Sequence, residues 1–184
     1  IVLGLAVLSV VMFHGTLNLN EIVHAQNQLR FGWLPSWNII LLPFTFVLLL
    51  IAAFAETNRA PFDLPEAEQE LVGGYHTEYT GLRYAWFMFG EYAAMFTMCA
   101  LLTTLFLGGW TLPGLTLPHG ILGGILAFGI FLVKVVALVF FFMWVRWTLP
   151  RLRWDQLMRF GWKRLIPAGL INILITAGLV HLWG

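Results

Sequence analysis

Residues 121–147 read ILGGILAFGIFLVKVVALVFFFMWVRW, an apolar run in which only Lys134 and Arg146 are charged. At about 1.5 Å per residue, a helix of this length crosses the roughly 30 Å hydrocarbon core of a bilayer. The run is continuously apolar, whereas the strands of a membrane β-barrel alternate. The sequence therefore predicts an all-α polytopic membrane protein. Five transmembrane helices are expected, at residues 1–19, 37–55, 84–107, 121–147 and 165–183.

The composition indicates the same class. Of the 184 residues, 60% are hydrophobic and 10% are charged, and the mean hydropathy is +0.84. A water-soluble domain of this size could not carry that composition without exposing a large apolar surface. The formal net charge is only +1, which gives no indication of a nucleic-acid partner.

The chain opens within an apolar run, IVLGLAVLSVVMF at residues 1–13, and begins with Ile1. This opening has neither the basic region nor the small-residue cleavage site of a signal peptide. No internal repeat or low-complexity linker divides the sequence. We therefore expect residues 1–184 to form a single transmembrane domain that is part of a longer protein, truncated at its N-terminus.

Basic residues indicate the orientation, because Lys and Arg are retained on the cytoplasmic side during insertion. They concentrate in or beside an acidic loop at 56–83 and a basic loop at 147–164, which we expect to be cytoplasmic together with the N-terminus of the chain. The first loop carries Glu56, Asp63, Glu66, Glu68, Glu70 and Glu78 against Arg59 and Arg83. The second and its border carry Arg146, Arg151, Arg153, Arg159, Lys163 and Arg164 against Asp155. One interpretation of these opposite charges is that the loops pair with each other.

The acidic loop also has a local pattern. Asp63 followed by Glu66 forms a capping-box pattern and Gly73 supplies a stop, which predicts a short helix over 64–72. Glu66 and Glu70 would then share one face of this helix. Two like charges in that arrangement are unfavourable unless a cation or a shared proton intervenes.

Glu91 lies about seven residues, or roughly 10 Å, into the third predicted helix. An ionised carboxylate is costly in lipid, so Glu91 should face protein or a water-filled cavity. Its neighbours at helical spacing, among them Phe87, Met88 and Met95, are mostly apolar and favour the neutral form. Glu91 is therefore a candidate for binding and releasing a proton near neutral pH. The alternative is a carboxylate hydrogen-bonded for packing only.

Lys134 lies deeper, about 20 Å from either end of the fourth predicted helix. Its side chain cannot extend that far to reach the interface. We expect it to need a buried carboxylate or a water channel. Pairing with an acid would give a second titratable element, and a purely structural ion pair is the alternative.

Other patterns carry less weight. Glu21 and His24 form an E-x-x-H, but the second copy and further carboxylates that a di-iron site needs are missing. Nucleotide-binding glycine motifs and C-x-x-C are also missing from the sequence, and Cys99 is its only cysteine. The sequence thus predicts no metal site and no cofactor bound by this chain.

Three stretches carry a family resemblance. AETNRAPFDLPEAEQELVGGYHTEYTG (55–81), followed by E-Y-A at 91–93, resembles the signature loop and following helix of the quinone-site membrane subunit of respiratory complex I, in its bacterial and mitochondrial forms. Lys134 with FFFMWVRWTLPRLRWDQLMRFGWKRLIP (140–167) is similar to the family's penultimate helix and the loop after it. GTLNLNEIVHAQ (15–26) also resembles the corresponding family segment.

The resemblance implies a fold of about eight helices, of which five are present here, in a proton-translocating NADH:quinone oxidoreductase. It implies that the chain helps to form the quinone chamber and has no redox centre of its own, with FMN and iron–sulfur clusters in partner subunits. The implied partners are the hydrophilic quinone-site subunits, including the one with the terminal cluster, and small and antiporter-like membrane subunits. The loop sequence looks more bacterial than mitochondrial, which implies the bacterial inner membrane.

The resemblance also implies residue roles. Proton coupling falls to Glu56, Asp63, Glu66, Glu68, Glu70, Glu91, Lys134 and Arg146. Organisation of the loop near the quinone falls to Arg59, Glu78 and Arg83.

Two other function classes stay open at this point. The equivalent subunit of a membrane-bound hydrogenase shares the fold but need not use quinone. A secondary ion transporter would use Glu91 and Lys134 as ion ligands, but it favours broken helices and repeated halves, which the sequence does not indicate. A passive anchor for hydrophilic partners would fit the charged loops and leave both buried ionisable residues unexplained.

Overall fold

The computed structural model describes residues 1–30, 34–59, 61–63, 81–114, 118, 120–150 and 152–183. Within these ranges the regular secondary structure is helical apart from one short antiparallel pair, β1 (Leu29–Arg30) with β2 (Leu34–Pro35). The helices are α1 (Val2–His14), α2 (Leu19–Gln26), α3 (Asn38–Leu41), α4 (Pro43–Glu56), α5 (Leu82–Phe106), α6 (Ile121–Thr148), α7 (Trp154–Phe160), the π-helical turn η2 (Gly161–Leu165) and α8 (Ile166–Trp183).

Three helical segments are long and apolar enough to cross a bilayer. They are α5, α6 and the stretch Trp154–Leu182, in which α7, η2 and α8 follow one another without a break. Their positions agree with the predicted runs at 84–107, 121–147 and 165–183. The predicted class, an all-α polytopic membrane protein, is confirmed.

The first two predicted runs are divided. α1 ends at Gly15, whose φ of 67° lies in the left-handed region that glycine adopts without strain. α2 then starts behind Asn18, whose side chain accepts from the Asn20 amide, and the two helices meet at 65°. Counting this bent pair as one span gives up to four spans in the described part of the chain, against five predicted runs.

The second run, predicted at 37–55, begins as the single turn α3 and restarts as α4 after Leu42. Pro43 opens α4 because a proline lacks the amide hydrogen that an unbroken helix would use there. α4 has 14 residues, which is shorter than the roughly 20 that a perpendicular span requires. The sequence analysis did not indicate these breaks.

The last helix also begins earlier than its predicted first residue, 165. Trp154 already starts α7, so much of the stretch 147–164, predicted as a loop, is helical. Leu157 and Phe160 pack against the core, and Leu165 is buried in it. A basic segment with an apolar face can therefore continue the helix into the interface.

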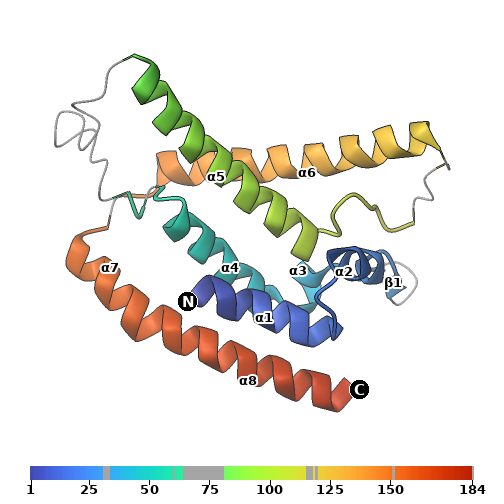
Figure 1. Ribbon diagram of the computed structural model, residues 1–184. Coiled ribbons are helices and arrows are strands. Elements are labelled where there is room, and N and C mark those ends of the chain that lie inside the picture. Colours follow the sequence, from blue (N-terminus) through green and yellow to red (C-terminus); the bar gives the residue numbers. More distant parts are fainter. Residues whose placement is uncertain are drawn as a thin grey trace.

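Figure 1 shows α1 lying between α8 and α4, while α5 crosses α4 and carries α6 beyond it. Aromatic contacts tie these layers together, with Phe54 of α4 stacked on Phe142 of α6 at a centroid separation of 3.9 Å. A chain of buried polar side chains links α1, α4 and α8. Thr45 donates to Asn172 over 2.9 Å, and Asn172 donates to Ser9 over 2.8 Å.

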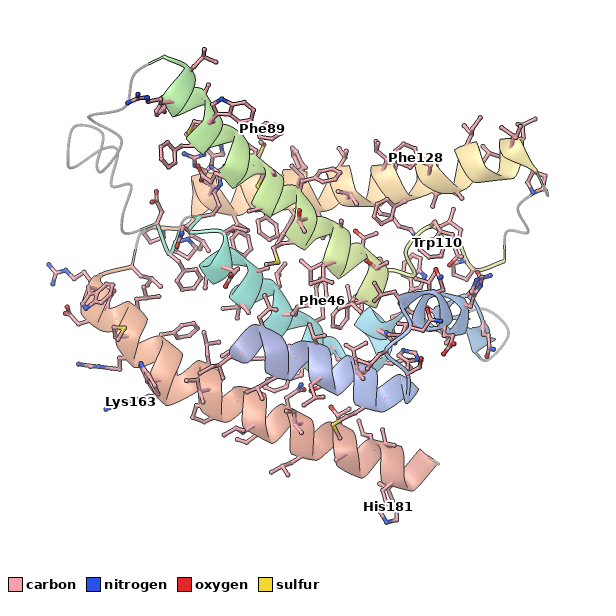
Figure 2. All side chains as sticks on the ribbon, viewed as in Figure 1. Phe46, Phe89, Trp110, Phe128, Lys163 and His181 are labelled. Carbon is pink, nitrogen blue, oxygen red and sulfur yellow. The ribbon has the colours of Figure 1, made fainter. Side chains whose placement is uncertain are left out.

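The outer faces of α5 and α6 are apolar and exposed. Figure 2 shows Phe89 and Phe128 projecting away from the bundle, whereas Phe46 lies between helices. Trp86 and Phe140 are likewise more than half exposed. Surfaces of this kind are stable only against lipid or further membrane-embedded protein.

Candidate functional site

The turn after α4 directs Arg59 inward. Thr57 ends the helix by donating its hydroxyl to the Ala53 carbonyl over 2.9 Å. Asn58 then adopts a φ of 47°, which its short polar side chain tolerates better than most residues do. The Arg59 amide returns to the Phe54 carbonyl over 3.3 Å. As a result the Arg59 side chain is buried rather than extended into solvent.

Arg59 forms an ion pair with Glu91, nine residues along α5. The Arg59 Nε to Glu91 Oε1 distance is 3.0 Å, and the two side chains are 6% and 13% exposed. The guanidinium also lies over the ring of Tyr92, with Cζ 4.7 Å from the centroid. A planar guanidinium can stack flat on a ring while its edge faces a carboxylate.

The pair is close but incompletely hydrogen-bonded. Among the described residues, Arg59 Nε, Arg59 Nη2 and Glu91 Oε1 have no hydrogen-bond partner, although Nε and Oε1 are 3.0 Å apart. Buried polar atoms are almost always satisfied. The attraction between the two groups is therefore mainly electrostatic.

A small pocket lies beside this pair, between α5 and α6. It is lined by Arg59, Tyr92, Met95, Phe142, Met143 and Arg146. Its volume of about 10 Å³ is close to the smallest that holds one water molecule. Arg146, near the end of α6, is thereby brought to the same place as Arg59. The structure thus groups Arg59, Glu91 and Arg146, which sequence reasoning had assigned to two different roles.

Of the other predicted site residues, three are described near the facing ends of α4 and α5, and the rest are treated below or lie outside the described ranges. Glu56 is the exposed last residue of α4, and Arg83 is exposed in the first turn of α5. Asp63 is half-buried directly after Phe62, whose ring stacks on Phe160 of α7. Glu66, Glu68, Glu70, Glu78 and Arg151, and the short helix predicted over 64–72, lie outside the described residues.

Lys134 belongs to a separate cluster. Its Nζ donates to the carbonyls of Leu107, Gly109 and Thr111 over 2.7, 3.0 and 2.7 Å, and it lies 5.3 Å from the Trp37 ring centroid. In the described part of the chain these carbonyls take the place of the expected carboxylate. They follow the C-terminal end of α5, where unpaired carbonyls and the helix dipole favour a cation.

Two buried amide side chains complete this helix end. Gln26 Nε2 donates to the Thr104 carbonyl over 3.1 Å and its Oε1 accepts from the Gly108 amide over 3.0 Å. Asn38 Nδ2 donates to the Leu105 carbonyl over 2.7 Å. Sequence reasoning missed both residues. Asn38 is an amide at the start of an apolar run, which could have marked it, whereas Gln26 lies in the connection between two runs and no sequence pattern marked it.

The E-x-x-H pattern has a structural explanation. Glu21 accepts hydrogen bonds from the Thr16 hydroxyl over 2.6 Å and from Asn18 Nδ2 over 3.1 Å at the start of α2. An acid in the first turn of a helix is also favoured by the helix dipole. His24 is exposed, and no three His, Cys, Asp or Glu side chains gather within the described ranges as metal ligands would.

Comparison with known proteins gives consistent matches. Residues 1–177 match the family model described as NADH dehydrogenase. The H-type subunit of NADH-quinone oxidoreductase from Protochlamydia amoebophila is 52% identical over 175 residues, which cover 95% of this chain and 49% of that protein. That of Bacillus cytotoxicus is 50% identical over 181 residues (98% and 50%), and that of Flavobacterium psychrophilum 44% over 180 residues (96% and 51%). The chain spans about half the length of these relatives.

Proposed function

Since this chain belongs to the NADH dehydrogenase family, we propose that it forms part of the membrane subunit that couples quinone reduction to proton translocation in an NADH:quinone oxidoreductase. The names of its relatives support the enzyme class. The Arg59–Glu91 ion pair is the observation that supports the coupling role, because it places the carboxylate of a candidate membrane-spanning helix beside a buried cation from another part of the chain.

The pair can act as a switch because its two members come from different elements. Glu91 belongs to α5, whereas Arg59 follows the end of α4 and lies in the acidic loop at 56–83. Reduction of quinone consumes protons as well as electrons and so changes the charge near that segment. If Arg59 is drawn toward new negative charge, Glu91 loses its countercharge and its neutral form becomes the more stable one. Glu91 then takes up a proton.

Return of Arg59 reverses this step. The ionised carboxylate is again the more stable form, and the proton leaves. The small pocket that joins Arg59 to Arg146 has room for a water molecule that could receive it. In this scheme the remaining carboxylates, Glu56, Asp63, Glu66, Glu68 and Glu70, supply and collect protons around Glu91.

The same proposal includes the partner subunits and the location of the complex. Glu78 and Arg83 help to organise the loop near the quinone. This chain needs no cofactor, while FMN and iron–sulfur clusters belong to hydrophilic partner subunits, and antiporter-like and small membrane subunits lie beside it in the bilayer. We place the assembly in a bacterial inner membrane, with both charged loops and the N-terminus of the chain on the cytoplasmic side.

Replacement of the acid tests the coupling role. In the intact complex in inverted membrane vesicles, Glu91→Gln keeps the shape and a hydrogen-bonding oxygen but cannot ionise. We expect proton pumping, measured by quenching of a pH-sensitive acridine dye, to fall at least tenfold relative to wild type. The matched control is Glu21→Gln, which removes an exposed carboxylate far from the pair and should leave pumping unchanged.

Undiminished turnover and pumping in Glu91→Gln, at normal assembly, would remove Glu91 from the mechanism. The enzyme class has its own test. A purified assembly that contains flavin-bearing, NADH-oxidising subunits agrees with the proposal. A nickel–iron subunit in their place would identify a membrane-bound hydrogenase instead.

A further inference from the structure

Three backbone carbonyls converge on the side chain of Lys134, near the middle of α6. Its Nζ lies 2.7, 3.0 and 2.7 Å from the carbonyl oxygens of Leu107, Gly109 and Thr111. A protonated amine has three N–H donors and no acceptor, so each donor has one oxygen at hydrogen-bond distance. The proposed coupling role makes no use of this arrangement.

The segment that supplies these carbonyls is held by contacts of its own. Gly108 and Gly109 have φ angles of 70° and 53°, in the left-handed region that favours glycine. The Gly108 amide donates to Gln26 Oε1 over 3.0 Å, and the Gly109 amide donates to the Thr103 carbonyl over 3.0 Å. The Thr111 hydroxyl donates to the Gly108 carbonyl over 2.8 Å. None of these bonds involves the ammonium group.

The three carbonyls lie at membrane depth. Lys134 is roughly 20 Å from either end of α6, which is long and apolar enough to cross the bilayer, and Figure 1 shows the chain that leaves α5 running along this helix. Non-helical backbone at such a depth needs partners from protein, because lipid supplies none. No backbone amide of the described residues donates to the three oxygens. The ammonium group is therefore what satisfies them.

Two further features favour a positive charge at this place. The carbonyls follow the C-terminal end of α5, where the helix dipole attracts cations, and unwound backbone at such helix ends coordinates cations in other membrane proteins. The Trp37 ring adds its π face, with its centroid 5.3 Å from Nζ. Gly108 permits this approach, because a Cβ at that position would lie 3.0 Å from Trp37 Nε1.

We propose that residues 107–111 and Trp37 form a binding site for a primary ammonium ion, and that Lys134 is its tethered occupant. The oxygens recognise the ammonium group rather than the chain that carries it. A free alkylammonium ion therefore binds there once the Lys134 side chain is shortened. In the wild type the tether gives the ammonium a high effective concentration, so dissolved amines do not displace it.

This site lies at the opposite end of α5 from Glu91. The proposal concerns how α5 and α6 are held together and does not depend on the Arg59–Glu91 pair. It can fail while the proposed function stands, and the reverse.

Lys134→Ala tests the site, because it removes the propylammonium part of the side chain and leaves its space. The thermal dissociation temperature of the intact purified complex is measured with and without n-propylammonium chloride at constant ionic strength. We expect a lower temperature than in the wild type without the amine, and a saturable recovery as amine is added. At about ten times its Kd, a ligand that binds only the assembled form shifts the dissociation equilibrium about tenfold.

The matched control is Lys134→Met, whose side chain fills the space and should be destabilised without recovery. The wild type should not respond to the amine. Tetramethylammonium has the charge but no N–H, and 1-propanol has the length but no charge, so neither should restore Lys134→Ala. Recovery by either compound, recovery of Lys134→Met, or no recovery of Lys134→Ala by propylammonium would overturn the proposal.

A measurement on the wild type serves if Lys134→Ala does not assemble. The sequence has two lysines, Lys134 and the exposed Lys163. An amine bound by carbonyls must be released before it is acylated, and even one hydrogen bond to a charged group lowers the released population about tenfold. With a membrane-permeant succinimidyl ester, we expect Lys134 to be acylated at least about tenfold more slowly than Lys163, as followed by mass spectrometry. Equal rates would show that the ammonium group is not held and would also overturn the proposal.

Discussion

Each end of α5 contacts a basic side chain, the buried Arg59 at one end and the half-buried Lys134 at the other, and the contacts differ. Near the N-terminal end, Arg59 faces one carboxylate, and several polar atoms of the pair have no hydrogen bond within the described residues. At the C-terminal end, Lys134 donates to three backbone carbonyls. A carbonyl cannot gain or lose a proton at physiological pH, whereas a carboxylate can. The comparison shows two ways of accommodating a cation in this bundle: one partner is a titratable side chain, and the others are backbone carbonyls.

The largest effect should come from removing the cation at the C-terminal end. Lys134→Met fills the same space but leaves three carbonyls without their donor, and each hydrogen bond to a charged group contributes about 1.5–3 kcal/mol. We expect a loss of at least about 3 kcal/mol, seen as a lower dissociation temperature of the complex and a smaller amount of assembled subunit. Lys134→Arg keeps the charge and serves as the control. Normal assembly with lost pumping would make Lys134 a coupling residue and end the contrast between the two ends.

A smaller effect should follow from Asn38→Ala. This change leaves the Leu105 carbonyl without its donor in a buried place, which costs about 2 kcal/mol. Thermal dissociation should occur at a lower temperature, with pumping per assembled complex unchanged. A specific loss of pumping would show that the polar cluster at this end also carries protons.

Next comes Arg59→Lys, which keeps the positive charge but loses the planar group that stacks on Tyr92. We expect a stability loss of about 1–2 kcal/mol together with a lower ratio of protons pumped to NADH oxidised. That ratio, measured in vesicles, distinguishes coupling from a general decline in activity. An unchanged ratio would show that any cation suffices at this position.

The smallest effect should come from Tyr92→Leu, which removes the ring beneath the guanidinium. The stacking is worth about 1 kcal/mol, so a modest decrease in the dissociation temperature is expected. Tyr92→Phe keeps the ring and should behave as wild type. If Phe lost as much as Leu, the hydroxyl rather than the stacking would be the important group.

Hydropathy was sufficient for the long helices, because an apolar run of spanning length has few other stable solutions. It did not show the bend at Gly15 or the restart at Pro43, which depend on local backbone conformation within apolar sequence. Hydropathy also assigned residues 154–164 to a loop. The charged residues of this segment lower its mean hydropathy, although its apolar residues recur at helical spacing.

For the candidate site, the sequence identified Glu91 and Lys134 correctly as costly groups in a membrane but not the partners they have in the structure. Arg59 reaches Glu91 only because Asn58 turns the chain back under the bundle. The carbonyls around Lys134 leave no trace in a sequence, because every residue has one. A sequence alone does not identify a partner that is a backbone atom, or a side chain whose position depends on one unusual φ angle. Such partners are found only in a three-dimensional structure.

The π-helical turn at Gly161–Leu165 gives the last span a place where its length can change. Such a turn holds one residue more than a regular one. The extra residue is taken up within about the same rotation as a regular turn, so loss of a single codon there would restore ordinary helical bonding and leave the residues on either side facing nearly as before. The basic end and the membrane-inserted end would keep their mutual orientation. This turn is therefore the position in the last helix where a one-residue deletion should be tolerated best.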